Sequence, residues 1–495
     1  MRTQLMTLGV VLLYFVVILL VGWFAGKMTK NMSDYMVSGR GLGVWMLSFG
    51  VMAAVMSGWS WLGNPGAVYD AGYAAAVRLT SLTPAGVVLA FALVAKPIRI
   101  ISNRTECFTL PDILAARWND NPAIRLLSCV IILIGSATYL VSQWSAMGTV
   151  MQMVLGISYE WGVVVGAIII TAYVVAGGML ASMWTNFVQM IIMFLVAILV
   201  VVKCVGAVGG FEQMNIAVSA INQSFVQPFH EKYDIISSLS YSLLVVFLAY
   251  SGQPGFSTKF LMIKDHRQLR WSPLISVIAM IVGTSMYVVG LVGVIMVENG
   301  QISAPATADG ILLSVTSAVF SPSVNALIMV AVMAAVMSTA ETHLFTSATS
   351  VVQDLAVKYL RKPMSDKKCI HLMRICIACV MIVTVILAVR PPDLISAIGA
   401  QAFGVLCAGF GPVLCLGLRW RRINSKGAIA GMTAGLIFGG ILPVVDPANV
   451  LLGEWTPAGI GVILSTVITI AVSVLTRAED AAVFSSTIVN PNSDD

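Results

Sequence analysis

Charged residues are scarce in this sequence. Asp, Glu, Lys and Arg make up only 10% of its 495 residues, whereas hydrophobic residues make up 58%. A soluble domain of ordinary composition carries about 25% charged residues. The chain is therefore predicted to be an all-α polytopic membrane protein embedded in a lipid bilayer, with no separate soluble domain. Its net charge of +6 is attributed to membrane topology and gives no indication of nucleic-acid binding.

Several motifs that would indicate other functions are missing. The sequence contains no P-loop, which argues against ATP-driven transport by this chain alone. Cys376 and Cys379 form a lone C-x-x-C without a second pair or a histidine cluster, so inert buried thiols are expected. Nothing indicates an enzyme, a cofactor or an obligatory protein partner. The first apolar segment lacks a small-residue cleavage site before Lys27, so it is interpreted as a retained helix.

Long apolar runs predict about thirteen membrane spans. They cover residues 5–26, 42–65, 75–95, 126–155, 160–178, 184–208, 235–255, 273–297, 323–353, 371–389, 394–418, 427–444 and 456–476. Most of the 28 Lys and Arg residues, Arg125, Lys259 and Lys358 among them, fall in the loops of one side. The positive-inside rule then predicts an outside N-terminus and a cytoplasmic C-terminus.

Two of the predicted spans are interrupted by glycine and proline. Gly58, Gly63 and Pro65 break the second span, and Gly252, Pro254 and Gly255 break the seventh. Backbone groups that are freed inside a membrane must line a cavity. Broken spans in corresponding halves of a chain point to the binding site of a transporter.

If the two broken spans are equivalent, the repeat unit contains five helices, and the odd number inverts the second copy. This predicts a 5+5 inverted-repeat core. The expected regions are an N-terminal extra helix with its inward loop (1–41), a first repeat (42–208), an outer loop with the second repeat (209–418), two C-terminal helices (419–477) and a cytoplasmic tail (478–495).

Four stretches of sequence carry a family resemblance. They are SDYMVSGRGLG at 33–43, MSGW at 56–59 followed by PGAV at 65–68, GQP at 252–254, and AAVMST at 334–339. Their order and spacing, over residues 5–475, resemble the sodium/solute symporter family, most closely its sodium/proline symporters. The resemblance implies the inverted-repeat fold of the bacterial leucine transporter (LeuT-like), a solute site and a sodium site near the midplane, and a bacterial inner (plasma) membrane.

The main sodium site of that family falls on five positions here. The resemblance implies backbone carbonyl ligands from Ala53, Met56 and Ala335, and hydroxyl ligands from Ser338 and Thr339. Sodium is a small hard cation, and an unwound helix frees carbonyl oxygens that can coordinate it. Taken without the resemblance, a Ser-Thr pair in an apolar helix is more often bonded to its own backbone.

The chain departs from the sodium/proline symporters at two acidic positions. Val55 and Asn186 stand where members of the family have aspartate, while Glu341 is an acidic residue deep inside a span, one turn from Ser338. The family's second cation site, where it exists, uses hydroxyls at the positions of Glu341 and Thr342. These two residues and Asn186 are therefore a candidate second-cation or proton site.

A structural role is the alternative interpretation of this region. Glu341 would then be a protonated acid hydrogen-bonded within the bundle. His343 is two residues further along the helix and is expected on another face, as a packing residue.

The solute pocket is predicted at Trp59, Tyr139, Tyr250 and Gln253, because the first three match aromatic pocket positions of the proline carriers. Aromatic rings can cover an apolar chain or ring, and free helix N-termini attract a carboxylate. Val246 replaces another pocket tryptophan of those carriers, which argues against assuming proline. Helix packing or an interfacial belt is the alternative role for each ring.

These observations predict a secondary active transporter that imports a small carboxylate-bearing solute, such as proline or a related amino acid. Sodium is the expected coupling ion. A proton-coupled symporter that uses Glu341, and a solute sensor that binds without transport, are the alternatives.

Overall fold

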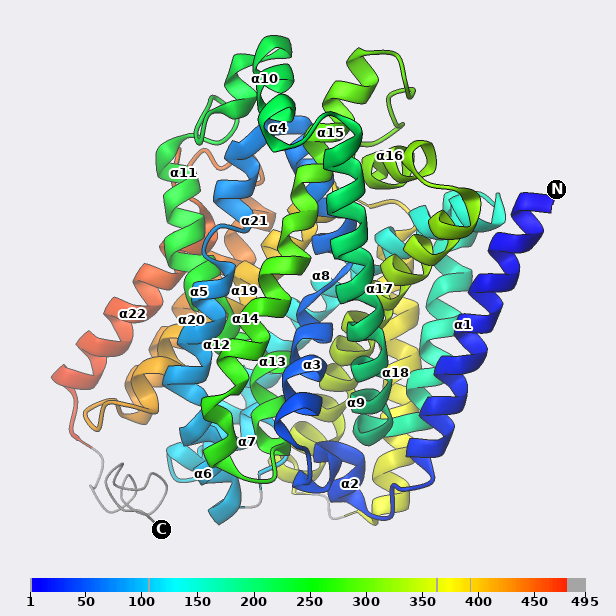
Figure 1. Cartoon of the computed structure of the whole chain (residues 1–495). Helices are drawn as coiled ribbons and strands as arrows, with labels where there is room; N and C mark the ends of the chain where they lie inside the picture. The colour runs from blue at the N-terminus through cyan, green and yellow to red at the C-terminus, as the bar shows by residue number, and fades with distance from the viewer. Residues whose placement is uncertain (1, 106, 362–363, 392, 479–495) are drawn as a thin grey trace.

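A computed structural model describes residues 2–478 except 106, 362–363 and 392 (Figure 1). The predicted tail therefore lies outside the described residues except for residue 478. The described residues form helices and connecting loops, with no β-strand. The prediction of an all-helical membrane protein is confirmed.

Eleven helical segments of the described chain are long and apolar enough to span a membrane, compared with about thirteen predicted. The other two predicted spans correspond to shorter apolar helices, Val44–Val55 and Tyr159–Val175. The first is short because its helix breaks after Val55. The second belongs to a long helix that kinks at Gly178, where φ is 65° and only glycine is free of strain.

The described residues of the first half form nine α-helices. They are α1 (Arg2–Gly26), α2 (Met32–Val37), α3 (Val44–Val55), α4 (Asn64–Leu79), α5 (Thr83–Ala90), α6 (Lys96–Thr105), α7 (Leu110–Arg117), α8 (Pro122–Leu155) and α9 (Tyr159–Ala207). Short 3-10 or π segments join several of them: η1 (Ser38–Arg40), η2 (Trp59–Gly63) and η3 (Phe91–Ala95).

The second half continues with α10 (Phe211–Ile221), α11 (Ile235–Leu239), α12 (Phe247–Gly252), α13 (Pro254–Ser257), α14 (Ser272–Thr284), α15 (Val288–Glu298), α16 (Ile311–Val319), α17 (Pro322–Thr349), α18 (Asp366–Ala388), α19 (Ile395–Gly417), α20 (Ser425–Leu436), α21 (Leu442–Val445) and α22 (Pro457–Leu475). Its 3-10 and π segments are η4 (Gln223–Val226), η5 (Ser240–Val246), η6 (Thr258–Met262), η7 (His266–Arg270), η8 (Ser285–Tyr287), η9 (Ala308–Gly310), η10 (Ser350–Tyr359) and η11 (Ile437–Ile441).

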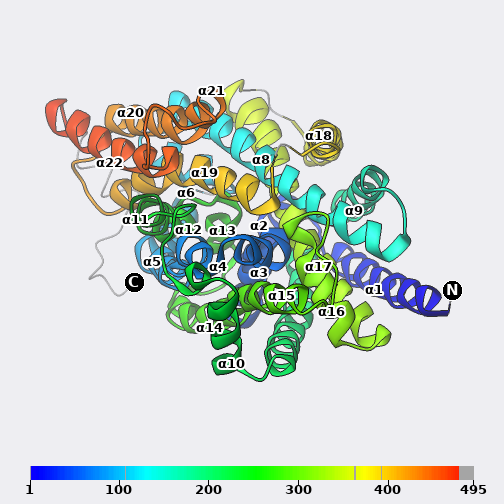
Figure 2. The same cartoon turned by 90° about the horizontal axis from the view of Figure 1, so that it is seen from above.

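The helices form a bundle with a buried centre and an apolar rim. Seen from above, α3, α4, α8, α17 and α19 lie toward the centre, with α1, α18 and α22 around them (Figure 2). The most apolar windows of α17 and α19 are 83% buried, whereas those of α1 and α18 are 28% and 22% buried. The outer helices instead expose large apolar side chains, as expected of surfaces that face lipid.

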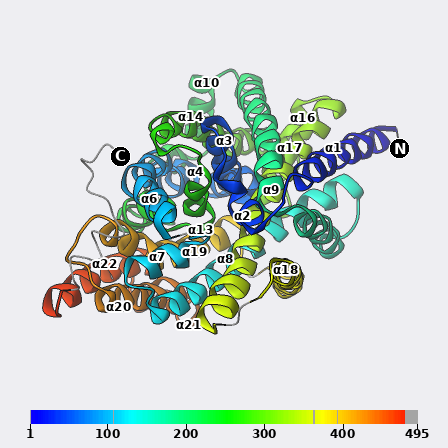
Figure 3. The same ribbon diagram turned by 90° about the horizontal axis from the view of Figure 1, so that it is seen from below.

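Both predicted breaks are present near the centre of the bundle. α3 ends at Val55, and Met56 is extended (φ −70°, ψ 107°) before the chain turns into η2 and α4. α12 ends at Gly252, and Gln253 is extended (φ −77°, ψ 113°) before α13 begins. On the lower side, α2, α6, α7 and α13 close the bundle (Figure 3). Because a helix stops at each break, each break leaves backbone groups without helical partners beside α17 or α8.

Candidate functional site

The five atoms predicted to bind sodium lie together where α3 ends against α17. Ser338 Oγ donates to the Ala53 carbonyl at 2.6 Å and to the Ala335 carbonyl at 3.1 Å. Thr339 Oγ1 donates to the Met56 carbonyl at 3.2 Å. All five residues are buried. The two hydroxyls thus reach the carbonyls of Ala53 and Met56 at the end of α3, while Ser338 also bonds to Ala335 of its own helix. The hydroxyl lone pairs can contribute to the same cluster of oxygens.

The end of α3 explains why these carbonyls are available. The last four carbonyls of a helix lack intrahelical partners, and the macrodipole makes this end negative. Ala54 was missed by the sequence analysis, yet its carbonyl also accepts from Thr339 Oγ1 at 3.2 Å. The arrangement gathers neutral oxygens at a negative helix end, which suits a small monovalent cation.

Three of the four predicted solute residues form an aromatic cluster around Phe403 of α19. The ring centroid of Phe403 lies 5.2 Å from Trp59, 6.1 Å from Tyr139 and 5.5 Å from Tyr250. The sequence analysis missed Phe403. At Gly399, one turn earlier in α19, a Cβ would approach the Trp59 ring to 3.0 Å. The absence of a side chain there lets Trp59 pack directly on α19.

The polar side of this aromatic cluster comes from the two breaks. Tyr139 donates its hydroxyl to Ser57 Oγ at 3.2 Å, and Gln143 accepts the freed Gly58 amide at 2.9 Å. Trp59 Nε1 is buried without a hydrogen-bond partner in the described chain. Gln253 is buried at the second break, three residues from Tyr250. Aromatic faces and an unpaired indole N–H therefore lie together at the first break, and the buried Gln253 lies at the second.

Glu341, Thr342 and Asn186 are all buried, but their polar atoms are satisfied to different degrees. Thr342 Oγ1 donates to the Ser338 carbonyl at 2.9 Å, and Asn186 Nδ2 donates to Ser182 Oγ at 3.4 Å. Both carboxyl oxygens of Glu341 and Oδ1 of Asn186 have no hydrogen-bond partner among the described residues. The described contacts therefore do not support the alternative interpretation of Glu341 as a hydrogen-bonded structural acid.

Two further polar residues border this region, and the sequence analysis did not find either of them. Gln189 of α9 donates through Nε2 to the Tyr14 hydroxyl of α1 at 2.9 Å. Tyr14 in turn points its hydroxyl at Met337 Sδ, a weak acceptor 3.6 Å away. His343 lies on another side of α17, where its ring stacks on Tyr139 at 4.5 Å and its Nδ1 contacts Ser136 Oγ at 3.1 Å. The packing role expected for His343 agrees with these contacts.

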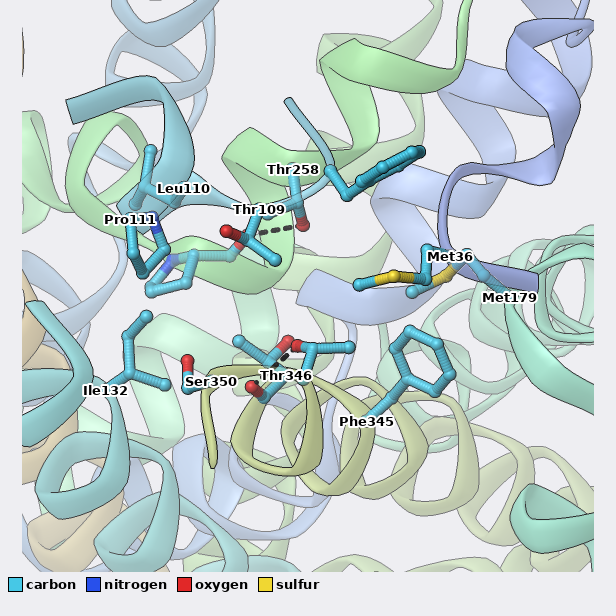
Figure 4. Close-up of a pocket in the computed structure, with 13 residues that line it drawn as sticks. Met36, Thr109, Leu110, Pro111, Ile132, Met179, Thr258, Phe345, Thr346 and Ser350 are labelled. Carbon is cyan, nitrogen blue, oxygen red and sulfur yellow. Dashed lines mark hydrogen bonds between the residues drawn. The ribbon is translucent and has the colours of Figure 1, made fainter. Parts of the chain in front are cut away.

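A small cavity lies between α7, α13 and the lower part of α17 (Figure 4). Its volume is about 10 Å³, enough for about one water molecule. Thr109, Thr258 and Thr346 supply hydroxyls to its wall, together with Met36 and Phe345. The cavity thus continues the polar face of α17 below the oxygens of Ser338 and Thr339.

An ion cluster joins α7, α8 and η10 beside this cavity. Arg125 contacts Asp112 at 2.5 Å and Asp354 at 3.3 Å, and Lys358 contacts Asp112 at 2.8 Å. Thr109 Oγ1 also donates to Asp354 at 2.6 Å. Burial disfavours the charged carboxylate, but Lys358 and Arg125 together hold the pKa of Asp112 below its ordinary value. Arg125 was assigned to a loop by the sequence analysis and is in fact buried and paired.

Comparison with solved structures identifies the fold. A sodium-coupled sialic acid symporter in a substrate-bound outward-open state superposes with a TM-score of 0.74 at 15% identity, covering 96% of this chain and 99% of that one. Mhp1, a nucleobase-cation-symport-1 family transporter in a closed conformation, superposes with a TM-score of 0.54 at 12% identity, covering 92% and 99%. The likeness, together with the two broken helices, defines the class by fold: a helical membrane protein with a LeuT-like core.

Sequence comparison gives the family. The model of the Sodium:solute symporter family matches residues 35–435. The osmoregulated proline transporter OpuE of Bacillus subtilis is 29% identical over 94% of each chain. The high-affinity proline transporter PutP of B. subtilis is 30% identical over 94% of this chain and 97% of its own. The sodium/proline symporter of Escherichia coli is 30% identical over 85% of this chain and 84% of its own. This chain belongs to the Sodium:solute symporter family.

Proposed function

We propose that this protein imports a small carboxylate-bearing solute by sodium symport, with proline as the first candidate solute. One observation carries the proposal: the five positions expected to bind sodium converge between α3 and α17, joined by contacts of 2.6 to 3.2 Å. Similarity to proline transporters over most of the chain supports the choice of solute.

The aromatic cluster supports a solute with an apolar body and an anionic group. Trp59, Tyr139, Tyr250 and Phe403 offer ring faces to an apolar chain or ring. The unpaired Trp59 Nε1 is a donor from which a carboxylate can accept a hydrogen bond, whereas the Gly58 amide already donates to Gln143. A buried donor without a partner is unfavourable, so a ligand that satisfies it gains binding energy.

If sodium and the solute both bind at the first break, the affinity for one would depend on whether the other is bound. The carbonyls on the α3 side of the break would hold sodium, and Trp59 would contact the solute. Each ligand would then stabilise the backbone arrangement that the other requires, which is a reciprocal coupling of affinities. The proposed orientation places the N-terminus outside and the C-terminus in the cytoplasm of a bacterial inner membrane.

Uptake into proteoliposomes tests this proposal. Radiolabelled proline should accumulate when an inward sodium gradient is imposed, and should exchange with unlabelled proline when the gradient is absent. A thermal-shift screen of amino acids and small carboxylates, with and without sodium, would identify a different solute. Equal stabilisation with and without sodium for every solute would contradict sodium coupling, and binding without counterflow would indicate a sensor.

A proton-coupled variant of this mechanism is supported by one separate observation. Glu341 has two buried carboxyl oxygens with no described hydrogen-bond partner. Such a group is stable in a membrane only with a bound proton or a nearby cation. Uptake driven by a pH gradient without sodium, and lost in Glu341→Gln, would favour this variant.

A further inference from the structure

Lys259 is a buried lysine for which the transport mechanism above has no role. It lies in η6, past the end of the span Ile235–Gly252, and its exposed fraction is 0%. Its ammonium donates to the backbone carbonyl of Gly50 in α3 at 2.8 Å. The sequence pattern predicts Lys259 in a loop, but the structure places it inside the bundle against the helix that ends at the proposed sodium site.

No described carboxylate forms an ion pair with Lys259. The elements packed against η6 carry Asp34 and Tyr35 on α2, Arg40 on η1, and Lys96, Arg99 and Arg104 on α6, while α3 and α13 carry no titratable side chain. Asp34 instead accepts from the amide of Lys30 at 2.9 Å. His343 on α17 lies within electrostatic range of the ammonium. The charge on Lys259 is thus opposed by burial and supported by a neutral carbonyl.

This setting makes Lys259 easy to deprotonate. Burial disfavours the charged ammonium and lowers the pKa of Lys259 to about 7. Both the ammonium and the neutral amine are then populated near neutral pH. An arginine at this position would stay charged throughout.

The ammonium and the proposed sodium ion depend on the same helix end. The Gly50 carbonyl lies three residues before that of Ala53, which is about 4.5 Å along the helix axis. Both carbonyls point toward the negative C-terminal end of α3. Two positive charges held by carbonyls one helical turn apart in a protein interior repel each other enough to weaken binding by at least about tenfold.

We propose that Lys259 is a proton-binding site that competes with sodium. When sodium binds at the end of α3, the Lys259 ammonium becomes the neutral amine, and one proton is released to water. When sodium leaves, the amine takes a proton back. Charge is balanced in each direction, because one cation replaces another. This inference rests on the sodium site of the proposed function and adds an exchanged proton to it.

Proton release from the purified full-length protein tests the inference directly. Sodium chloride is added to wild-type protein in weakly buffered detergent solution at pH 7, and a pH dye records the proton; potassium chloride is the blank. We expect a substoichiometric proton release with sodium only. The apparent sodium affinity, measured by tryptophan fluorescence, should strengthen at least about tenfold from pH 6 to pH 8.5 as the amine becomes neutral.

Two variants assign the effect to Lys259. Lys259→Met should abolish proton release and make the sodium affinity independent of pH. Lys259→Arg should also abolish release, but should leave sodium affinity at pH 8.5 at least about tenfold weaker than in the wild type. Lys264→Met, which removes an exposed lysine five residues away, is the matched control and should behave as the wild type.

The outcomes separate this inference from the proposed function. If wild-type protein binds sodium with a pH-independent affinity and releases no proton, the inference is wrong while sodium coupling stands. Release that persists in Lys259→Met would assign the proton to another group and would also overturn it. If sodium produces no response at any pH, the proposed sodium site itself fails. Where Lys259→Met does not fold, Lys259→Arg supplies the same test of proton release, and absence of release from the wild type overturns the inference without any variant.

Discussion

Two polar regions of α17 lie one helical turn apart and satisfy their oxygen atoms in opposite ways. Ser338 and Thr339 donate their hydroxyls to carbonyls at the end of α3, so these groups are paired without an ion. Glu341 has two carboxyl oxygens with no described partner. When no ion is bound, the Ser338 and Thr339 hydroxyls can hydrogen-bond to the carbonyls of α3. The Glu341 carboxyl group, by contrast, needs a proton or a cation at all times. The first region is therefore suited to an ion that is bound and released in each cycle.

Removing both hydroxyls should have the largest effect. The double variant Ser338→Ala, Thr339→Ala loses two of about five expected sodium ligands and leaves carbonyls unpaired. Sodium-dependent uptake should fall about 100-fold, as expected when two interactions of about 1.5 kcal/mol each are lost. Thr466→Ala, which removes a hydroxyl bonded within peripheral α22, is the matched control. Unchanged sodium dependence in the double variant would refute the site assignment.

Neutralising Glu341 should have a smaller effect that separates its two candidate roles. If Glu341 attracts sodium electrostatically, Glu341→Gln should weaken sodium affinity about tenfold, and Val55→Asp should restore part of it. If Glu341 carries a proton, the same variant should lose uptake driven by a pH gradient and retain solute exchange. Uptake under separately imposed sodium and proton gradients distinguishes these outcomes. Wild-type behaviour under both gradients would leave Glu341 as a structural acid.

The parts of the site that follow from local sequence were predictable. Glycine and proline in an apolar run predicted both breaks, because unwound backbone requires a cavity inside a membrane. The family motif placed Ser338 and Thr339, and the structure brings them to the carbonyls of Ala53 and Met56. The predicted number of spans was too high. A break and a kink shortened two of the predicted spans, so eleven helices of the described chain are long and apolar enough to cross a membrane.

The residues that were missed are contributed by packing between distant helices. Phe403, Tyr14 and Gln189 sit in apolar helices whose sequence periodicity does not reveal which neighbour each face meets. Lys259 was misassigned because a basic residue just past an apolar run is normally a loop residue. Its contact with Gly50 spans 209 positions in the sequence. Only the folded arrangement shows that it meets the end of α3.

The aromatic cluster allows a third test, aimed at the solute and leaving the ion site intact. Trp59→Ala, Tyr250→Ala and Phe403→Leu each remove ring surface from the cluster and should weaken proline binding about tenfold. Sodium affinity measured without solute should stay close to wild type. Trp271→Ala, which removes an exposed tryptophan, is the control. Wild-type binding isotherms for all three cluster variants would show that the pocket lies elsewhere.

The smallest expected effect concerns Asp309, a buried carboxyl on the other side of the aromatic cluster. It lies in η9, and its Oδ2 accepts the Ile395 amide at 2.9 Å at the start of α19. η9 also packs closely on α4, because a Cβ at Gly66 would approach the Ala308 carbonyl to 2.9 Å. This short segment thus joins the broken helix to the helix that carries Phe403.

Burial raises the pKa of Asp309 to about 6 from its ordinary value of 3.8. The raised pKa means that the Asp309 carboxyl binds a proton more tightly when η9 is docked than when the carboxyl is hydrated. Docking is therefore fully favoured below about pH 4 and weakens as the pH rises through 6. We expect hydrogen exchange of residues 308–310, corrected for intrinsic rates, to increase about threefold between about pH 5.5 and about pH 6.5. Asp309→Asn keeps the acceptor for the Ile395 amide but cannot ionise, so it should remove this dependence. An identical pH slope in Asp309→Asn would mean that another group controls the docking of η9.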